Sequence, residues 1–227
     1  MNKSIKAIIK VNFTLPRSTI LVPLILLAAG ILDVILDYYL NSPGNTGVSL
    51  GNYLYTAIIF APIFIAGHNY KRIMHLGGKK YDFFWGSLLN YIILAAAVSA
   101  INLICYTSVD TLFQARLEIL NLIEVFGWTN NGLVAAYFQQ FAFLLWIAVF
   151  VHTLVMLQEF RIGWIIDVAL IAILCVFIPI MPLRSVLVWF FYLTIYYPAA
   201  YVQIAACIGL SAIVYSLNLA ILKKKKI

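Results

Sequence analysis

Residues 133–157, LVAAYFQQFAFLLWIAVFVHTLVML, decide the fold class, because this stretch contains no Asp, Glu, Lys or Arg. A membrane-spanning helix needs roughly 20 mostly apolar residues, and this stretch is long enough. Of the 227 residues, 64% are hydrophobic and 10% are charged, against roughly 25% charged residues in soluble domains. The mean hydropathy of +1.00 is too high for one soluble core to hide the apolar residues. We therefore predict an all-α integral membrane protein.

Charged and turn-forming residues divide the rest of the chain into five further apolar stretches of similar length. The six predicted transmembrane helices cover residues 19–40, 51–67, 85–106, 133–157, 163–182 and 200–222. Residues 1–16 place isoleucines opposite lysines on a helical wheel, which predicts an amphipathic helix on the inner leaflet. A basic tail without fixed structure is the alternative. The whole chain, residues 1–227, is expected to form a single transmembrane domain.

The positive charges indicate the orientation of these spans. All but Arg116 and Arg184 of the 15 Lys and Arg residues fall in segments that six spans place on one side of the membrane. Positively charged loops are retained in the cytoplasm, so we expect a multi-pass protein of a bacterial plasma membrane with both termini cytoplasmic. The formal charge of +7 is thus explained by orientation, and no nucleic-acid partner is expected.

Three outer connections join the predicted spans. Residues 41–50 contain Gly, Pro and Asn and predict a short turn region. Residues 107–132 predict a surface helix that lies over the spans. Pro182 and Pro198 bracket an apolar aromatic segment that is too short to cross the membrane twice. We predict that this segment forms a short re-entrant outer hairpin between spans five and six.

The sequence offers few groups for catalysis. A nucleophile would have to pair Ser211 or Ser99 with His152, but no Gly-x-Ser-x-Gly turn surrounds either serine and no carboxylate is placed to orient the histidine. The three cysteines lack metal-ligand spacing. Residues 77–80 lack the earlier glycine and the following Ser or Thr of a phosphate-binding loop. We expect no catalytic site, no metal and no cofactor bound by this chain.

Two carboxylates lie four residues apart on one face of the first predicted span. Asp33 and Asp37 could line a path for a cationic or amphipathic cargo, because acidic groups within spans often serve transport. They could instead sit at the outer interface, since Tyr38 and Tyr39 follow and tyrosines favour that depth. Both interpretations stay open.

The inner connection after the second span carries the most specific pattern, HNYKRIMHLGGKKYDFFWGSLLNYI at residues 68–92. It resembles the membrane subunits of type-2 ATP-binding-cassette exporters. In that family a short basic helix, a Leu-Gly step, a basic pair, an aromatic pair and a glycine form the element that docks on the ATPase subunit. The corresponding residues here are Lys71-Arg72, Leu76-Gly77, Lys79-Lys80, Phe83-Phe84 and Gly86.

This resemblance implies a function. It implies an exporter that moves a hydrophobic or amphipathic peptide, lipid or drug outward by alternating access. Its partners would be an ABC ATPase subunit, which holds the ATP and Mg, and a second permease copy or paralogue that completes a dimer. The inner coupling loop, residues 68–84, would contact the ATPase. The coupling residues implied are Tyr70, Lys71, Arg72, His75, Leu76, Gly77, Lys79, Lys80, Tyr81, Phe83 and Phe84.

Two other classes of function remain as alternatives. A non-transporting membrane interaction, assembly or immunity protein would use its spans for binding, and residues 68–84 would then be an ordinary positively charged connector. An intramembrane hydrolase would depend on Ser211 and His152.

Overall fold

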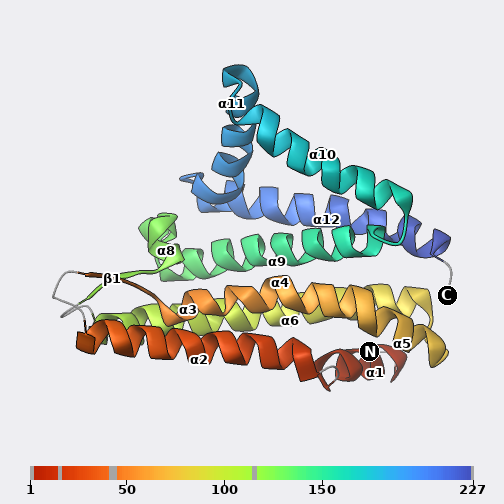
Figure 1. Cartoon of the computed structure of the whole chain (residues 1–227), viewed down its shortest axis with the longest axis horizontal. Helices are drawn as coiled ribbons and strands as arrows, with labels where there is room; N and C mark the ends of the chain where they lie inside the picture. Colours follow the sequence, from red (N-terminus) through yellow and green to blue (C-terminus); the bar gives the residue numbers. More distant parts are fainter. Residues whose placement is uncertain (1–2, 15–16, 41–44, 114–116, 226–227) are drawn as a thin grey trace.

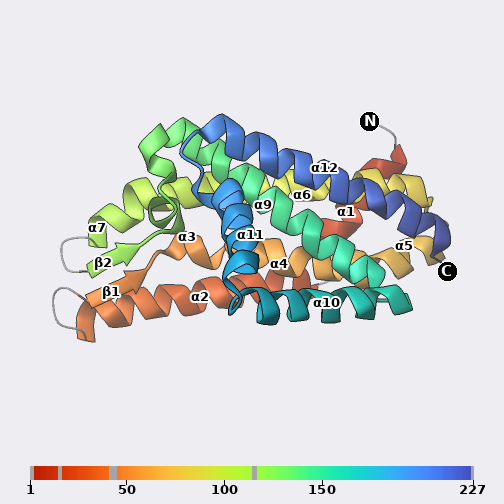
Figure 2. The same cartoon turned by 90° about the horizontal axis from the view of Figure 1, so that it is seen from above.

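The computed structural model describes residues 3–14, 17–40, 45–113 and 117–225. Long helices lie side by side in an elongated bundle, from which the pair α10 (Arg161–Phe177) and α11 (Met181–Phe191) projects (Figures 1 and 2). Both ends of the chain lie at one end of the bundle (Figure 1). We call this the basic end, because lysines near both termini gather there, and the other the opposite end.

Several helices are long and apolar enough to cross a bilayer. Four such segments occur in the described part of the chain, and the bent pair α10–α11 makes a fifth if it counts as one broken span. Within α2 (Arg17–Leu40), the residues whose side chains are described include one shorter apolar helix, Leu24–Leu36. The chain is therefore a mostly helical membrane protein, and the count of six spans stays a prediction. The four segments are Leu50–His75, Lys80–Phe113, Leu133–Leu157 and Ala200–Lys224.

The N-terminal segment forms the predicted helix, α1 (Lys3–Thr14), and residues 1–2 and 15–16 lie outside the described part. The helix is amphipathic, with Ile8 buried while Lys6 and Lys10 are exposed. It packs on α6 (Lys80–Ile104), where Gly86 lets it approach closely. A Cβ atom on Gly86 would lie 2.7 Å from Cγ2 of Ile8. The apolar face of α1 is thus buried partly against protein.

The second apolar segment extends further than predicted. It comprises α3 (Leu50–Tyr53), α4 (Tyr55–Phe64), the π-helical turn η1 (Ile65–Asn69) and α5 (Tyr70–His75). Only residues 76–79 then connect it to α6. The predicted loop 68–84 is therefore wrong in extent, because Tyr70, Ile73 and Met74 are buried and keep this segment helical.

The opposite end holds two short strands where a turn and a surface helix were predicted. β1 (Asn45–Val48) pairs in parallel with β2 (Leu117–Leu120), with Asn45 opposite Leu117. The predicted helix over 107–132 is wrong, because the strand pair and buried polar side chains interrupt it. Residues 41–44 and 114–116 lie outside the described part. The remaining elements here are η2 (Cys105–Asp110), α7 (Thr111–Phe113), α8 (Leu122–Val125) and the 3-10 turn η3 (Trp128–Asn131).

The predicted fifth span and hairpin also differ from the structure. α10 ends at Phe177, before the predicted boundary at 182, and a bend of 115° separates it from the helix over Met181–Tyr196. The predicted hairpin is thus a single arm, α11 followed by the π-helical turn η4 (Tyr192–Tyr196). Pro182 lies in the first turn of this arm, where proline fits because its missing N–H is not needed.

The centre of the bundle is α9 (Leu133–Leu157), which packs against α4, α6 and α12 (Ala200–Lys224). Aromatic side chains fill the space between these helices. The ring of Phe83 meets Tyr70 edge-on and stacks with His152, whose Nδ1 atom lies 2.6 Å from the hydroxyl oxygen of Tyr91. Tyr215 donates a hydrogen bond of 2.6 Å to the carbonyl of Phe84. These contacts fix the starts of α5 and α6 to the bundle.

Candidate coupling site at the basic end

The connection between α5 and α6 is a four-residue turn built on two glycines. The N–H of Gly77 donates to the carbonyl of Met74 at 3.0 Å, and the N–H of Gly78 donates to that of Ile73 at 2.9 Å. This pattern is a Schellman motif, which requires a left-handed residue after the helix. Gly77 supplies it with a φ of 79°. A Cβ on Gly78 would lie 2.8 Å from the carbonyl oxygen of Ile73, so both positions require glycine.

The structure divides the eleven predicted coupling residues into three groups by their burial. Tyr70, Phe83 and Phe84 are buried in the core, so their aromatic rings pack the bundle and cannot contact a partner directly. Lys80 is half-buried. The exposed residues are Lys71, Arg72, His75, Leu76, Gly77, Lys79 and Tyr81.

Leu76 is the most distinctive of the exposed residues. Its side chain is 74% exposed at the tip of the turn, although a leucine gains free energy from burial. Beside it lies a concave pocket of about 240 Å³ between the turn and α1. The lining residues are Ala7, Ile8, Val11, Ile73, Leu76, Gly77 and Gly78. The turn therefore offers an apolar tip and an adjoining apolar hollow, and Lys79 of the same turn is exposed.

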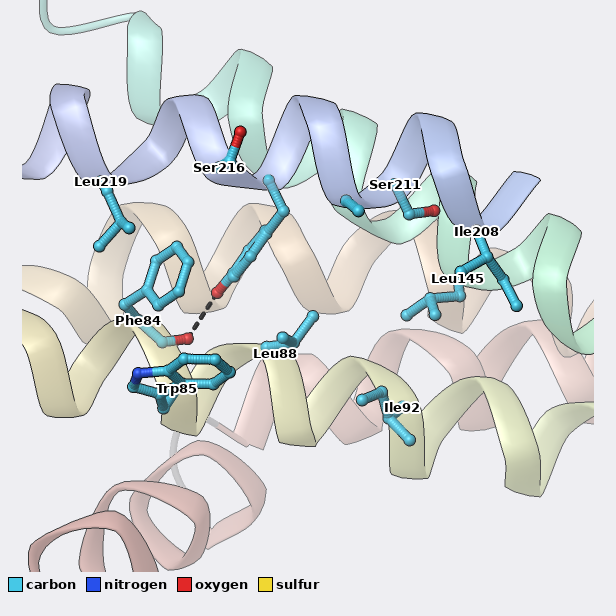
Figure 3. Close-up of a pocket in the computed structure, with 11 residues that line it drawn as sticks. Phe84, Trp85, Leu88, Ile92, Leu145, Ile208, Ser211, Ser216 and Leu219 are labelled. Atoms are coloured by element: carbon cyan, nitrogen blue, oxygen red, sulfur yellow. Dashed lines mark hydrogen bonds between the residues drawn. The ribbon is translucent and has the colours of Figure 1, made fainter. Parts of the chain in front are cut away.

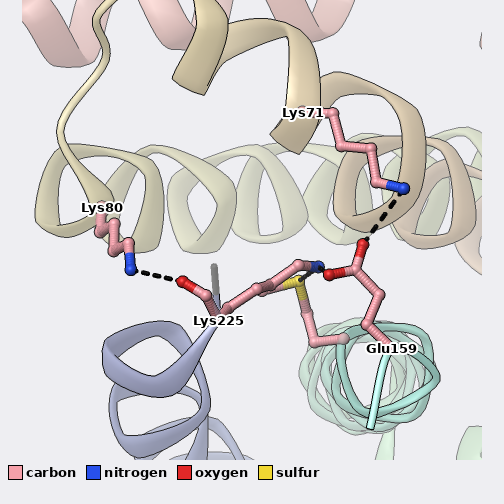
Figure 4. A network of polar contacts seen from close by, with 5 residues as sticks. Lys71, Lys80, Glu159 and Lys225 are labelled. Atoms are coloured by element: carbon pink, nitrogen blue, oxygen red, sulfur yellow. Dashed lines mark hydrogen bonds and ion pairs between the residues drawn. The ribbon is translucent and has the colours of Figure 1, made fainter. Parts of the chain in front are cut away.

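A network of charged side chains ties the ends of the helices together behind the turn (Figure 4). Glu159, in the connection between α9 and α10, lies 3.4 Å from Nζ of Lys71 and 3.3 Å from Nζ of Lys225. Lys80 donates from Nζ to the backbone carbonyl of Lys225 at 2.6 Å. Glu159 thus links α5 to the end of the chain, and Lys80 links that end to the start of α6.

Lys225 is buried although it is charged. Its ammonium lies 3.5 Å from Sδ of Met156 and 4.2 Å from the centre of the Tyr70 ring. Burial lowers the pKa of Lys225, and the carboxylate of Glu159 acts in the opposite direction. Lys225 is thus held inside the basic end by a cation–π contact and an ion pair. The sequence indicated only a run of terminal lysines here.

The structure describes the side chain of one of the two predicted cargo carboxylates. Asp33 is exposed on α2 and accepts a hydrogen bond of 2.8 Å from the hydroxyl of Tyr53. The side chain of Asp37 lies outside the described residues. The structure therefore leaves both interpretations of this pair open.

Two of the three candidate hydrolase residues bond to other groups. Ser211 donates to the carbonyl of Cys207 at 2.7 Å, while His152 pairs with Tyr91. Ser99 is buried, and its hydroxyl has no hydrogen-bond partner among the described residues. No hydrogen bond joins either serine to His152 in the described part of the chain. A nucleophile–base pair is therefore not assembled between these residues.

A buried polar cluster at the opposite end was missed in the sequence analysis. The amide nitrogen of Asn121 lies 3.0 Å from Oγ of Ser49, 3.0 Å from Oδ2 of Asp110 and 3.1 Å from Oδ1 of Asn102. Ser49 in turn donates to Oδ1 of Asp110 at 3.0 Å. We call these four residues the opposite-end cluster. It joins the segments on either side of the strand pair, and its members are too far apart in sequence to form a motif.

Comparison of the chain with protein-family models, curated proteins and solved structures gives no match, so its function has to be inferred from the basic end itself.

Proposed function

We propose that this chain is the transmembrane subunit of an ATP-driven exporter of the type-2 ABC class. The observation that carries the proposal is the exposed turn at residues 76–79, which projects between two helices that the buried Tyr70 and Phe83 anchor in the core. An apolar tip on a rigid base suits docking into a cleft of a soluble partner, because the base transmits movement of the tip to the bundle.

The charged network supports this transmission. A force on the turn reaches α5 and α6 directly, and the pairing of Lys71 with Glu159 passes it to the connection between α9 and α10. The contact of Lys80 with Lys225 passes it to the end of α12. ATP and Mg bind to the partner ATPase in this proposal, and closure of that partner drives alternating access. The basic end then faces the cytoplasm.

The projecting pair α10–α11 supports a dimer of permease subunits. Its apolar side chains, including Trp164, Val168, Ile171 and Trp189, are exposed, and Gly163 is the only residue of α10 that is buried. An exposed apolar surface of this kind contacts lipid or another protein. A second copy or a paralogue would cover it, and the cargo path would lie between the two chains. The apolar walls suit a hydrophobic or amphipathic peptide, lipid or drug.

A matched pair of variants tests the docking turn. Leu76 and Leu112 are 74% and 76% exposed, and they lie at the two ends of the bundle. Three tagged proteins would be purified from the native host in mild detergent: the unchanged chain, Leu76→Glu and Leu112→Glu. Mass spectrometry would identify the proteins that copurify with each in stoichiometric amounts. We expect a soluble ATPase with a phosphate-binding loop to copurify with the unchanged chain and with Leu112→Glu, and to be lost from Leu76→Glu.

Other outcomes would contradict the proposal. If Leu76→Glu retained the ATPase as well as Leu112→Glu does, the turn would not be the docking element. If no ATPase accompanied the unchanged chain, the exporter proposal would be wrong. A stoichiometric membrane protein in its place would support the alternative of an interaction, assembly or immunity protein.

A further inference from the structure

An apolar groove runs along the surface of the bundle between α6 and α12, with Leu145 of α9 between them (Figure 3). Its volume of about 370 Å³ lies within the range of about 300–1,000 Å³ that is usual for small-molecule sites. The lining residues are Phe84, Trp85, Leu88, Ile92, Leu145, Ile208, Ser211, Ala212, Tyr215, Ser216 and Leu219.

The hydroxyl groups of the groove are already bonded to the protein. Ser211 donates to the carbonyl of Cys207, Tyr215 to that of Phe84 and Ser216 to that of Ile213. A polar ligand would therefore find few donors along the walls. The groove instead matches a hydrocarbon chain, which needs apolar contact alone.

The length and position of the groove match one leaflet of a bilayer. Residues 208 to 219 of α12 cover about 16 Å at the helical rise of about 1.5 Å per residue. This is about half of a hydrocarbon core of about 30 Å. The groove reaches toward the basic end, because its lining residues Phe84 and Trp85 lie near the start of α6, where Lys80 contacts Lys225 just after α12.

Lys223 and Tyr81 continue the groove toward the basic end, next to its lining residue Trp85. Lys223 follows Leu219 by four residues and Ser216 by seven, so it lies on the face of α12 that lines the groove. Tyr81 precedes Trp85 by four residues on α6, and the two rings are in edge-on contact at 6.2 Å. All three are exposed, and Lys223 forms no ion pair with a described residue. Aromatic residues and lysines in this order are typical of the boundary between acyl chains and headgroups.

We propose that the groove binds an anionic phospholipid of the leaflet at the basic end. One acyl chain lies between α6 and α12, and the phosphate pairs with Lys223 beside Tyr81 and Trp85. The choice of an anionic lipid rests on charge complementarity, because Lys223 is unpaired among described residues while Glu159 is engaged by Lys71 and Lys225. This inference concerns a resident lipid and holds whether or not the chain is an exporter.

Tryptophan quenching by brominated acyl chains tests the proposal. The protein in mild detergent would be titrated with dibromostearoyl phosphatidylglycerol or with the corresponding phosphatidylcholine. The quenching of Trp85 is obtained by subtracting the fluorescence quenching of Trp85→Phe from that of the unchanged chain. We expect the brominated phosphatidylglycerol to quench Trp85 at about fivefold lower concentration than the phosphatidylcholine does. This ratio corresponds to the attraction of one lysine to an anionic surface.

Two neighbouring lysines provide the matched control. Lys224 lies in the same turn as Lys223 and is exposed, but it is on a different face of α12. Lys223→Gln should remove the preference for phosphatidylglycerol, and Lys224→Gln should retain it. Equal quenching by both lipids in the unchanged chain, or equal effects of the two lysine changes, would overturn the proposal.

A second pair of variants tests the groove separately from the headgroup site. Ala212 lines the groove, whereas the exposed Ile213 next to it does not. Ala212→Phe should fill the groove and abolish quenching of Trp85 by both lipids, while Ile213→Phe should leave it in place. Quenching that is the same in both variants would show that Trp85 contacts only the surrounding lipid, and the groove would not be a binding site.

Discussion

The ammonium of Lys225 lies 4.2 Å from the centre of the Tyr70 ring, so the last described residue of the chain packs on the first residue of α5. A cation over an aromatic face is stabilised by the charge distribution of the ring, and more so when both are shielded from water. Lys225 and Tyr70 are 2% and 1% exposed. Lys225 is therefore part of the folded bundle at the basic end.

Substitutions of Tyr70 should separate the role of the ring from that of the hydroxyl. The hydroxyl of Tyr70 is buried and has no hydrogen-bond partner among the described residues. Tyr70→Phe keeps the ring and removes this group, so the melting temperature in mild detergent should stay the same or rise. Tyr70→Leu loses the ring and should lower the stability by about 1–2 kcal/mol. If Tyr70→Phe lowered the melting temperature as much as Tyr70→Leu does, the cation–π contact would be contradicted.

Loss of Glu159 should destabilise the chain in a pH-dependent way. Glu159→Gln leaves the buried Lys225 without its carboxylate, at a cost of about 1–3 kcal/mol. Lys71→Gln, the control, breaks a pair whose lysine is 66% exposed and should cost about 0–1 kcal/mol. Both costs would be measured as changes in thermal unfolding in detergent.

The sign of the pH effect follows from burial. Burial lowers the pKa of Lys225, so between that pKa and the ordinary lysine value the folded chain binds fewer protons than the unfolded chain. Stability therefore rises with pH in this range. Without Glu159 the pKa of Lys225 falls further and the range widens. The loss of stability caused by Glu159→Gln should thus become smaller as the pH is raised. A loss of stability that does not change with pH would argue against a charged Lys225.

The close approach of α1 to α6 predicts a difference between two glycines. A Cβ on Gly86 would lie 2.7 Å from Cγ2 of Ile8, whereas a Cβ on Gly209 of α12 would meet nothing within 4 Å. Gly86→Ala should displace α1 and cost about 1–3 kcal/mol of stability. Gly209→Ala should be neutral or stabilising by up to about 1 kcal/mol, because alanine favours a helix. Equal melting temperatures of the two variants would show that α1 does not pack on α6.

The opposite-end cluster predicts that a nearly isosteric change is severe. Asn121→Asp replaces the amide nitrogen, which lies 3.0 Å from Oδ2 of Asp110, with an oxygen. Two carboxyl groups this close cannot both ionise without a large cost, so the pair takes up a proton in the folded state. Asn121→Asp should lower the melting temperature more than Asn121→Ala at neutral pH.

Acidification provides the check on this explanation. The folded Asn121→Asp chain binds more protons than the unfolded chain, so its stability should rise as the pH falls toward 5. The difference between the Asp and Ala variants should therefore narrow in acid. If it stayed constant with pH, repulsion between carboxylates would not be its cause.

Some elements could be predicted from the sequence because composition alone fixes them. Residues 133–157 form α9 with the predicted bounds, and α12 begins at the predicted residue 200. In both cases a long apolar run ends at polar or turn-forming residues. The bend between α10 and α11 was placed too late in the chain, because residues 178–180 are as apolar as the helices beside them.

Pairings between distant segments could not be predicted. The strands β1 and β2 are four residues each, and neither alternates strongly enough to be recognised without its partner. At the basic end, the sequence motif grouped Phe83 and Phe84 with the exposed Leu76. In the structure Phe83 and Phe84 are buried and Leu76 is not. The burial of the two phenylalanines depends on His152 and Tyr215, which lie on other helices.

The parallel pairing of β1 with β2 also has a consequence for biogenesis. The two strands are separated in the chain by the helices α4 and α6, and a ribosome releases β1 long before β2. The ladder can form only after both of these helices have been inserted and both strands have reached the same side. β1 must therefore wait without its partner during synthesis, and its pairing marks the completion of the first half of the bundle.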